Sequence, residues 1–278
     1  MQISPAYDRP IVSIDQVAGV GAACVRQRRR LLDVLGSLAD DQWAAPSRCE
    51  DWRVQDVAAH LVGVDGYWRA SIAAGLAGTP TRLLDGFDPK ATPAMMVAVA
   101  ATQSPEQTLV ELVAATTGLC DLVESLGDDA WAVLAESPAG HVAISDVVHH
   151  ALWDAWVHER DVMLPLGLTP AEEADEILAS LRYVAAISPC FALMAGAART
   201  PAALVLEVTD PSARIVIDVD DTVRVHDGEP VVADPVVLHG RAVDLTESLS
   251  ARAPLDQDVP GDKRWLVASL AEVFEVSP

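Results

Sequence analysis

Residues 149–161 read HHALWDAWVHERD, and the interpretation of the whole chain starts from this stretch. It combines three histidines and three acidic residues with two tryptophans and several small or branched apolar side chains. An α-helix turns by about 100° per residue, so His150, Asp154 and His158 each lie about 40° beyond the last. Asp161 falls between the first two, and all four lie within an arc of about 80°. The spacing therefore predicts a helix with one face of metal-competent side chains.

A metal site would need a further ligand from another helix. An acid and a histidine four residues apart can bind one divalent ion, and a second histidine would complete the three protein ligands of a catalytic zinc. His60 is the candidate, because it lies on the apolar face of the helix predicted for DWRVQDVAAHLVG (51–63). The same residues also fit a simpler interpretation, in which His60 is a hydrogen-bonded core residue and Asp154 and His158 form a surface pair.

Two other residues of this face have open roles. His150 fits a third ligand on this helix, a hydrogen-bond donor behind the ligands, or a mere neighbour. Asp161 fits a carboxylate that orients a ligand histidine, or a solvated side chain. Helical spacing alone does not separate these alternatives.

Length, charge and cysteine usage restrict the class of protein. The 278 residues are 51% hydrophobic, enough for one large domain or two ordinary ones. A net charge of −22 disfavours binding to nucleic acid. The longest apolar stretches are broken by charged residues or histidine, so no membrane span is expected. The four scattered cysteines and an N-terminal stretch unlike a secretory signal predict reduced thiols and a cytoplasmic location.

Hydrophobic periodicity divides the chain into two parts and predicts an α+β protein. Residues 1–199 read as a helical bundle, whose first helix is expected to start at residue 16. Ser104 is expected to cap a helix that starts at Pro105. The basic cluster RQRRR (26–30) is interpreted as a solvated helix face in this bundle. Residues 200–278 read as a small α+β domain, with three alternating segments that predict an antiparallel meander, followed by two helices.

Three motifs resemble one known family. They are EDWRVQDVAAHLVG (50–63), ALWDAWVHERDV (151–162) and the tail LHGRAVDLTESLSARAPLDQDVPGDKRWLVASLAEVF (238–274). In this order and spacing the first two resemble the mycothiol-dependent maleylpyruvate isomerase family, a branch of the DinB-like metal-binding four-helix bundles. The third is similar to the small C-terminal domain of that family, which is itself sterol-carrier-like.

The resemblance implies a divalent metal, preferably Zn²⁺, held by His60, Asp154 and His158. Family members often have Glu where this chain has Asp154, whose shorter side chain requires the ion to lie nearer the helix or to be bound less tightly. Arg53 also stands where the family usually has a Ser or Thr cap. Arg252 is the candidate to bind a substrate carboxylate between the two domains, although a plain salt bridge would explain it too.

The activity implied by the resemblance is thiol chemistry. In the isomerase, mycothiol adds to a conjugated double bond, the new single bond rotates, and elimination gives the trans product; other relatives are thiol transferases. The expected partners are a small electrophile and a low-molecular-weight thiol, and DinB-like relatives make a homodimer plausible. The alternatives are a non-catalytic protein that binds a metal or small ligand, and a self-associating helical scaffold.

Overall fold

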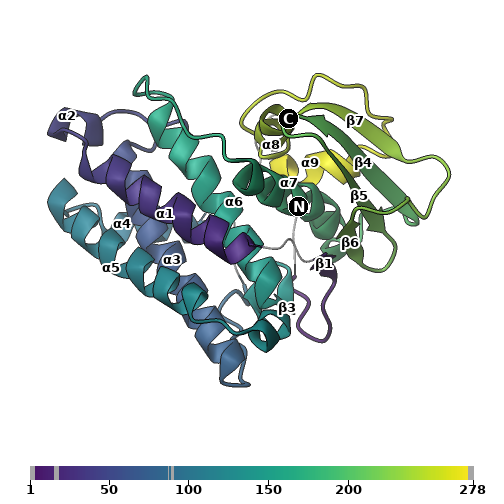
Figure 1. Ribbon diagram of the computed structural model, residues 1–278, viewed down its shortest axis with the longest axis horizontal. Coiled ribbons are helices and arrows are strands. Elements are labelled where there is room, and N and C mark those ends of the chain that lie inside the picture. Colours follow the sequence, from purple (N-terminus) through teal and green to yellow (C-terminus); the bar gives the residue numbers. More distant parts are fainter. Residues whose placement is uncertain (1–3, 16–18, 87, 89–90, 275–278) are drawn as a thin grey trace.

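Helix α6 (Ile144–Met163) lies in the middle of a helical bundle in the computed structural model, which describes residues 4–15, 19–86, 88 and 91–274. The bundle has three further long helices: α1 (Val20–Gly36), α3 (Val54–Leu76) and α5 (Pro105–Glu124). Helices α1 and α3 each pack against both α5 and α6, which closes a four-helix arrangement (Figure 1). The predicted start of the first helix at residue 16 lies outside the described residues.

Local capping explains where two bundle helices begin. The predicted cap of α5 is confirmed: Ser104 Oγ accepts the Gln107 N–H, and the Gln107 side chain accepts the Ser104 N–H at 2.9 Å. Helix α3 has no hydroxyl cap at Arg53, but the Asp56 carboxylate accepts the Arg53 backbone N–H at 2.9 Å. Asp56 thus satisfies a backbone N–H at a helix start that lacks the usual Ser or Thr.

Shorter elements fill the connections. Helix α2 (Asp40–Trp43) precedes α3, and α4 (Ala91–Val99) follows it. The short helix η1 (Asp128–Ala132) and a hairpin of β2 (Leu134–Ser137) and β3 (Gly140–Ala143) connect α5 to α6. These two strands were not predicted from the sequence.

The second layer of the fold is a five-stranded sheet covered by helices. Its strands are β1 (Val12–Ile14), β4 (Ala202–Thr209), β5 (Ala213–Val219), β6 (Val223–His226) and β7 (Val236–Arg241), in the order β1-β6-β5-β4-β7. The antiparallel meander of β4, β5 and β6 is confirmed, whereas β1 and β7 join in parallel at the two edges. The chain is therefore α+β, as predicted, although its N-terminal strand enters the sheet of the other part.

Helix α7 (Ala174–Met194) connects the bundle to the sheet. It packs against α6 on one side and against α8 (Ala242–Leu249) and α9 (Trp265–Phe274) on the other (Figure 1). Among the described residues, α7 is the one helix long and apolar enough to cross a membrane, and 83% of its most apolar window is buried inside the protein. Its apolar character is thus used in packing between the two parts.

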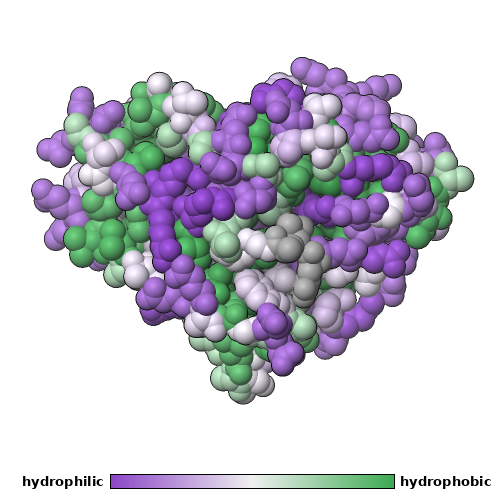
Figure 2. Space-filling model, viewed as in Figure 1, coloured by the Kyte–Doolittle hydropathy of each residue, from purple (hydrophilic) through white to green (hydrophobic). Residues whose placement is uncertain are grey.

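The basic cluster on α1 differs from the prediction. Arg26 and Arg29 are exposed, and Figure 2 shows hydrophilic side chains gathered over this helix. Arg28, however, is 2% exposed, so the predicted fully solvated face is wrong at this position. Its guanidinium reaches the buried Asp65 on α3 at 3.0 Å, and this pairing allows a charged side chain to lie inside the bundle.

Asp146 makes the stability of this fold sensitive to pH. It lies in the first turn of α6, where Oδ1 accepts the Ile14 N–H of β1 at 3.2 Å, and it is only 4% exposed. Burial raises the pKa of Asp146 to about 7. Since this value lies above that of an unfolded chain, about 3.9, Asp146 stabilises the folded state at low pH and loses that effect as pH rises through 7.

We expect Asp146→Asn to remove this dependence. Between pH 5 and pH 8 the free energy of unfolding should fall by roughly 2–3 kcal/mol more in the wild type than in the variant, because only the carboxyl group must ionise in a buried place. Urea denaturation at a series of pH values measures the difference. Asp221→Asn, at an exposed aspartate (74% of the side chain), is the matched control and should follow the wild-type curve. Parallel pH curves for the wild type and Asp146→Asn would contradict the prediction.

Candidate metal centre

Helix α6 is accessible over one short segment only. Of its residues, all are buried except Trp153 and Asp154. A helix buried on nearly every side must satisfy its polar groups inside the protein. The polar side chains predicted to share one face therefore have partners within the core, and the helix meets solvent beside Asp154.

The structure brings His60, Asp154 and His158 together. Asp154 Oδ1 lies 3.8 Å from His60 Nε2 and 3.7 Å from His158 Nε2, and the two imidazole rings are 4.9 Å apart between centroids. One ligand atom from each residue lies within 4.8 Å of the others. These gaps are too long for hydrogen bonds. An ion bonded at about 2.0–2.2 Å to each atom would span the two gaps at Asp154.

Unpartnered polar atoms at the same place fit a metal ion. Asp154 Oδ2 and His60 Nδ1 are buried and have no hydrogen-bond partner among the described residues. A buried carboxylate oxygen without a partner is costly unless a ligand or water meets it. The donor set of two imidazoles and one carboxylate is one that catalytic zinc sites use. The residues present therefore fit a divalent ion.

His158 is held by a carboxylate on its far side. Its Nδ1–H donates to Asp161 Oδ2 at 3.0 Å, which leaves Nε2 directed toward Asp154. Asp161 is fully buried, and the guanidinium of Arg252 donates to both of its oxygens at 2.9 Å. The sequence left two roles open for Asp161, orienting a histidine or facing solvent, and these contacts fit the first. Arg252 in turn holds Asp161 in place.

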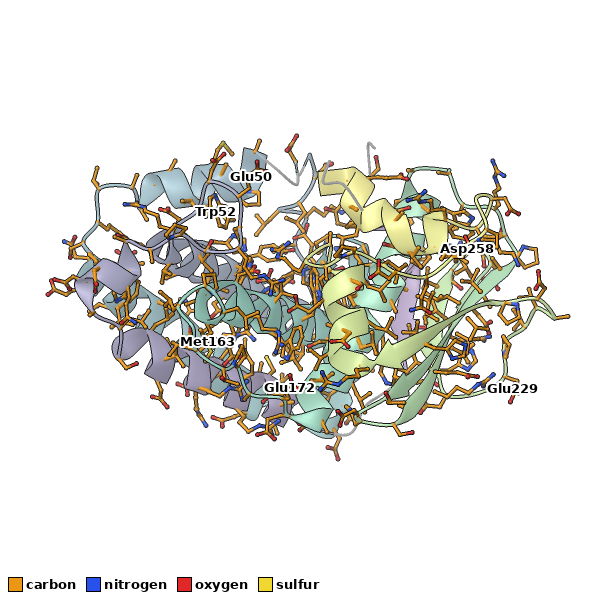
Figure 3. The ribbon with its side chains drawn as sticks, turned by 90° about the horizontal axis from the view of Figure 1, so that it is seen from above. Glu50, Trp52, Met163, Glu172, Glu229 and Asp258 are labelled. Atoms are coloured by element: carbon orange, nitrogen blue, oxygen red, sulfur yellow. The ribbon has the colours of Figure 1, made fainter. Side chains whose placement is uncertain are left out.

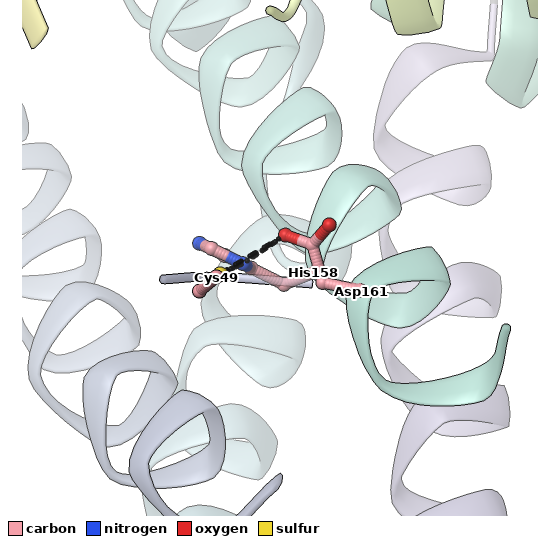
Figure 4. Close-up of side chains that lie close together, drawn as sticks. All are labelled: Cys49, His158 and Asp161. Carbon is pink, nitrogen blue, oxygen red and sulfur yellow. Dashed lines mark hydrogen bonds and ion pairs between the residues drawn. The ribbon is translucent and has the colours of Figure 1, made fainter. Parts of the chain in front are cut away.

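Cys49 completes this group, as Figure 4 shows. Its Sγ donates to Asp161 Oδ2 at 3.2 Å and lies 3.7 Å from His158 Nδ1. Cys49, His158 and Asp161 thus form a second set with ligand atoms within 4.8 Å of each other. Since Arg252 already occupies both carboxylate oxygens, this set is less free to accept a cation than the first.

Charged side chains join this centre to the C-terminal part of the chain. Glu247 on α8 accepts from Arg160 of α6 at 2.8 Å and also from Arg48. Arg252 follows α8 directly, after Ala251, which has a left-handed φ of 57°. Non-glycine residues rarely adopt this conformation, and such strain is often found beside functional groups.

An aromatic residue packs on the outer side of His60. The Trp52 ring lies 5.3 Å from the His60 ring, on the connection that leads into α3 (Figure 3). Within the part of the chain that the structure describes, His60 Nδ1 has no hydrogen-bond partner comparable to Asp161 beside His158. This imidazole is therefore held by packing against the rings of Trp52 and His158.

Burial and neighbours shift the acidity of these groups. Burial alone would raise the pKa of Asp154, but His60 and His158 outweigh it and hold that pKa well below its ordinary range. Burial is likewise outweighed at Asp161, where His158 and Arg252 lower the pKa of the carboxyl. Burial lowers the pKa of His158, but Cys49 and Asp161 raise it by more, so the pKa lies well above its ordinary value. A bound metal would therefore displace a proton from this ring.

His150 is not brought into the ligand set. Its Nδ1 forms a hydrogen bond of 2.5 Å with the hydroxyl of Tyr183 on α7. Its ring lies 4.5 Å from the ring of Trp68 and 5.5 Å from that of Trp153. Neither group of converging ligand atoms found among the described residues includes His150, so the structure does not bring it to the place of a third ligand on α6.

Several residues around the centre were not anticipated. Cys49, Arg48 and Glu247 were not singled out, and Trp52 was noted only as part of a motif. All four cysteines are free, as expected, but that expectation did not set Cys49 apart. No spacing rule links residue 49 to residue 161, so only the three-dimensional contact could reveal it.

The fold and this centre define a class: a four-helix bundle with a metal-competent set of two histidines and one aspartate, joined to a helix-covered sheet. A family model described as the mycothiol maleylpyruvate isomerase N-terminal domain matches residues 24–163. The chain therefore belongs to the mycothiol maleylpyruvate isomerase family, as its motifs suggested. No curated protein matches the sequence significantly.

Two solved structures are similar in fold. A crystal structure of the mycothiol-dependent maleylpyruvate isomerase has a TM-score of 0.61 and 17% sequence identity, and it covers 91% of this chain and 96% of that chain. A crystal structure of a point mutant of a protein of the same description has a TM-score of 0.60 and 16% identity, with the same coverage. The likeness extends over both the bundle and the sheet.

Proposed function

We propose that the protein is a divalent-metal-dependent enzyme that activates a low-molecular-weight thiol, such as mycothiol, toward a small electrophile. The observation that carries this proposal is the convergence of His60, Asp154 and His158 in a chain of this family. The outcome for the electrophile is cis–trans isomerisation or transfer of the thiol. The proposal includes zinc as the ion, a cytoplasmic location and a homodimer, and excludes nucleic acid and membrane as partners.

The chain's own residues divide the work. His60, Asp154 and His158 would hold the ion, which supplies Lewis-acid chemistry and lowers the pKa of a thiol when bound. Asp161 fixes the tautomer of His158 by accepting its Nδ1–H. The residues packed around α6 exclude bulk water from this helix except near Trp153 and Asp154.

Arg252 is the proposed cation for a substrate carboxylate. Its Nε and Nη2 bind Asp161, while its Nη1 has no hydrogen bond among the residues that the structure describes. A quarter of the side chain is exposed, so a carboxylate could reach the free edge of the guanidinium. The arginine would then both hold Asp161 and bind substrate.

A turnover experiment tests the proposal. Zinc-loaded protein is incubated with maleylpyruvate in the presence and absence of mycothiol, and the trans product and any thiol adduct are quantified. We expect conversion only when thiol and zinc are both present. If zinc binds but no electrophile reacts with any thiol tried, the protein binds a metal or ligand without catalysis.

Asp161→Asn is expected to weaken zinc binding about 10- to 100-fold, the usual cost of changing a group behind a metal ligand. The amide can still accept the His158 proton, but it removes the negative charge that raises the basicity of the ring. Competition with a fluorescent chelator measures the zinc affinity. Asp258→Asn, on the exposed surface near the sheet (Figure 3), is the control and should leave the affinity unchanged. Unchanged affinity in Asp161→Asn would contradict the assigned role.

A further inference from the structure

His150 is a polar side chain that the proposed metal set does not use. It lies one turn before Asp154 on α6 and keeps 9% of its surface exposed. Its ring packs between the rings of Trp68 and Tyr183, each at 4.5 Å between centroids. This packing fixes the orientation of the His150 ring beside the accessible segment of α6.

The hydroxyl of Tyr183 determines which ring nitrogen carries the proton. Tyr183 is 6% exposed, and burial raises the pKa of its phenol well above the ordinary value, so the hydroxyl keeps its proton. Among the described residues, its one hydrogen-bond partner is His150 Nδ1. A buried O–H must donate to avoid a large cost. Nδ1 is therefore the acceptor, and the proton of the neutral imidazole is on Nε2.

The Nε2–H group is left available for a ligand. No described residue accepts a hydrogen bond from it, and unlike His149 Nε2 it is not among the fully enclosed nitrogen atoms without a partner. It therefore contributes to the small exposed surface of His150. The Asp154 carboxylate is near enough to raise the pKa of His150, while burial outweighs it and lowers that pKa to about 4. His150 thus remains a neutral donor at physiological pH.

We propose that the Nε2–H of His150 donates a hydrogen bond to the substrate oxygen that becomes negatively charged during thiol addition. This inference rests on the proposed function. In the addition, the thiolate sulfur forms a bond to the β-carbon of a conjugated carbonyl, and the π electrons move to the carbonyl oxygen. His150 keeps its proton and stabilises this enolate oxygen. When the C–S bond breaks again, the electrons return to the double bond and the thiolate leaves.

This arrangement is suited to stabilising developing charge. A neutral imidazole held by Tyr183 and two tryptophans needs no reorganisation when the oxygen becomes negative. The buried, aromatic surroundings give a low local dielectric, in which a single donor has a larger effect than in water. The substrate class that it implies is an electrophile with a carbonyl conjugated to the reacting double bond.

The tautomer is tested first, without turnover. Zinc-loaded protein with ¹⁵N-labelled histidine should give an NMR signal for a neutral His150 with its proton on Nε2 at pH 7. In Tyr183→Phe the acceptor bond at Nδ1 is lost, and the signal should shift toward a mixture of tautomers. A wild-type His150 protonated on Nδ1 would overturn the inference.

Kinetics test the role. In His150→Phe, kcat with maleylpyruvate and mycothiol should fall about 100-fold or more, as when one such donor is removed. His150→Gln retains an N–H near the same place and should recover part of the rate. His239→Phe, at a histidine with 65% of its side chain exposed, is the control and should keep the wild-type rate.

Two further measurements separate this inference from the proposed function. Zinc content, and the absorption change of cobalt-substituted protein on adding thiol, should be the same in His150→Phe and wild type. Wild-type kcat in His150→Phe, or loss of zinc from it, would overturn the role of His150 and leave the proposed function in place. A zinc-loaded wild type without thiol-dependent turnover would overturn the proposed function, and this inference with it.

Discussion

Replacing His158 with alanine is expected to abolish stoichiometric zinc binding. His158 Nε2 faces Asp154, while its Nδ1 is fixed by the buried Asp161. Removing it takes away a proposed ligand and leaves Asp161 with Arg252, Cys49 and, at 3.7 Å, Arg48 as side-chain partners. The zinc affinity should fall by more than the 10- to 100-fold cost of losing an outer partner. Thiol-dependent activity should fall with it.

Elemental analysis of protein purified without an affinity tag measures this loss. The wild type should contain about one zinc per chain, and His60→Ala should resemble His158→Ala. Asp154→Glu is the conservative variant: the longer side chain still offers carboxylate oxygens, so zinc should be retained. His239→Ala, at an exposed histidine on β7, should keep full zinc. Zinc at wild-type levels in both His60→Ala and His158→Ala would exclude the proposed ligand set.

Much of the helical part could be predicted from the sequence, because the signals that define it are local. The cap at Ser104 and Pro105, and the apolar period of α6, depend on residues within one or two turns of each other. The same holds for the proposed ligand pair Asp154 and His158, which helical geometry alone places on one face. Predicting that His60 joins this pair required a further expectation, namely that the apolar faces of α3 and α6 pack together.

Other features depend on contacts between distant parts of the chain. Strand β1 has only three residues and is recognised as a strand by its parallel pairing with β6, more than two hundred residues later. The contact of Arg252 with Asp161 also joins distant residues, 91 apart in the sequence. A short polar–apolar alternation, or a single arginine, contains no information about such partners until the chain is folded.

The role of His150 illustrates the same limit within the opening stretch itself. Its place on α6 could be predicted, but its partner Tyr183 lies on another helix. Spacing therefore left a ligand, a donor and a bystander equally open. Among the described residues, His150 belongs to neither group of ligand atoms that lie within 4.8 Å of one another, and the hydrogen bond from Tyr183 defines which ring nitrogen carries the proton.

Arg28→Ala should destabilise the protein by about 3–5 kcal/mol, the cost of leaving a buried charge without its partner. Arg28 on α1 donates to Asp65 on α3 through Nε at 3.1 Å and Nη2 at 3.0 Å, and also to the backbone oxygen of Ala151 on α6 at 2.9 Å. Thr116 on α5 donates to the other oxygen of Asp65 at 2.6 Å. One ion pair thus joins all four bundle helices. Its loss leaves Asp65 buried with Thr116 as its one hydrogen-bond partner among the described residues.

Arg29→Ala is the matched control for this prediction. Arg29 is the next residue of the same helix, but its pair with Glu124 is exposed on both sides, so solvent screens it and its loss should leave the free energy of unfolding nearly unchanged. Guanidinium denaturation compares the two free energies of unfolding. If Arg28→Ala does not fold, Arg28→Met combined with Asp65→Leu removes both charges and should recover much of the stability. Equal losses for Arg28→Ala and Arg29→Ala would show that the buried pair does not hold the bundle together.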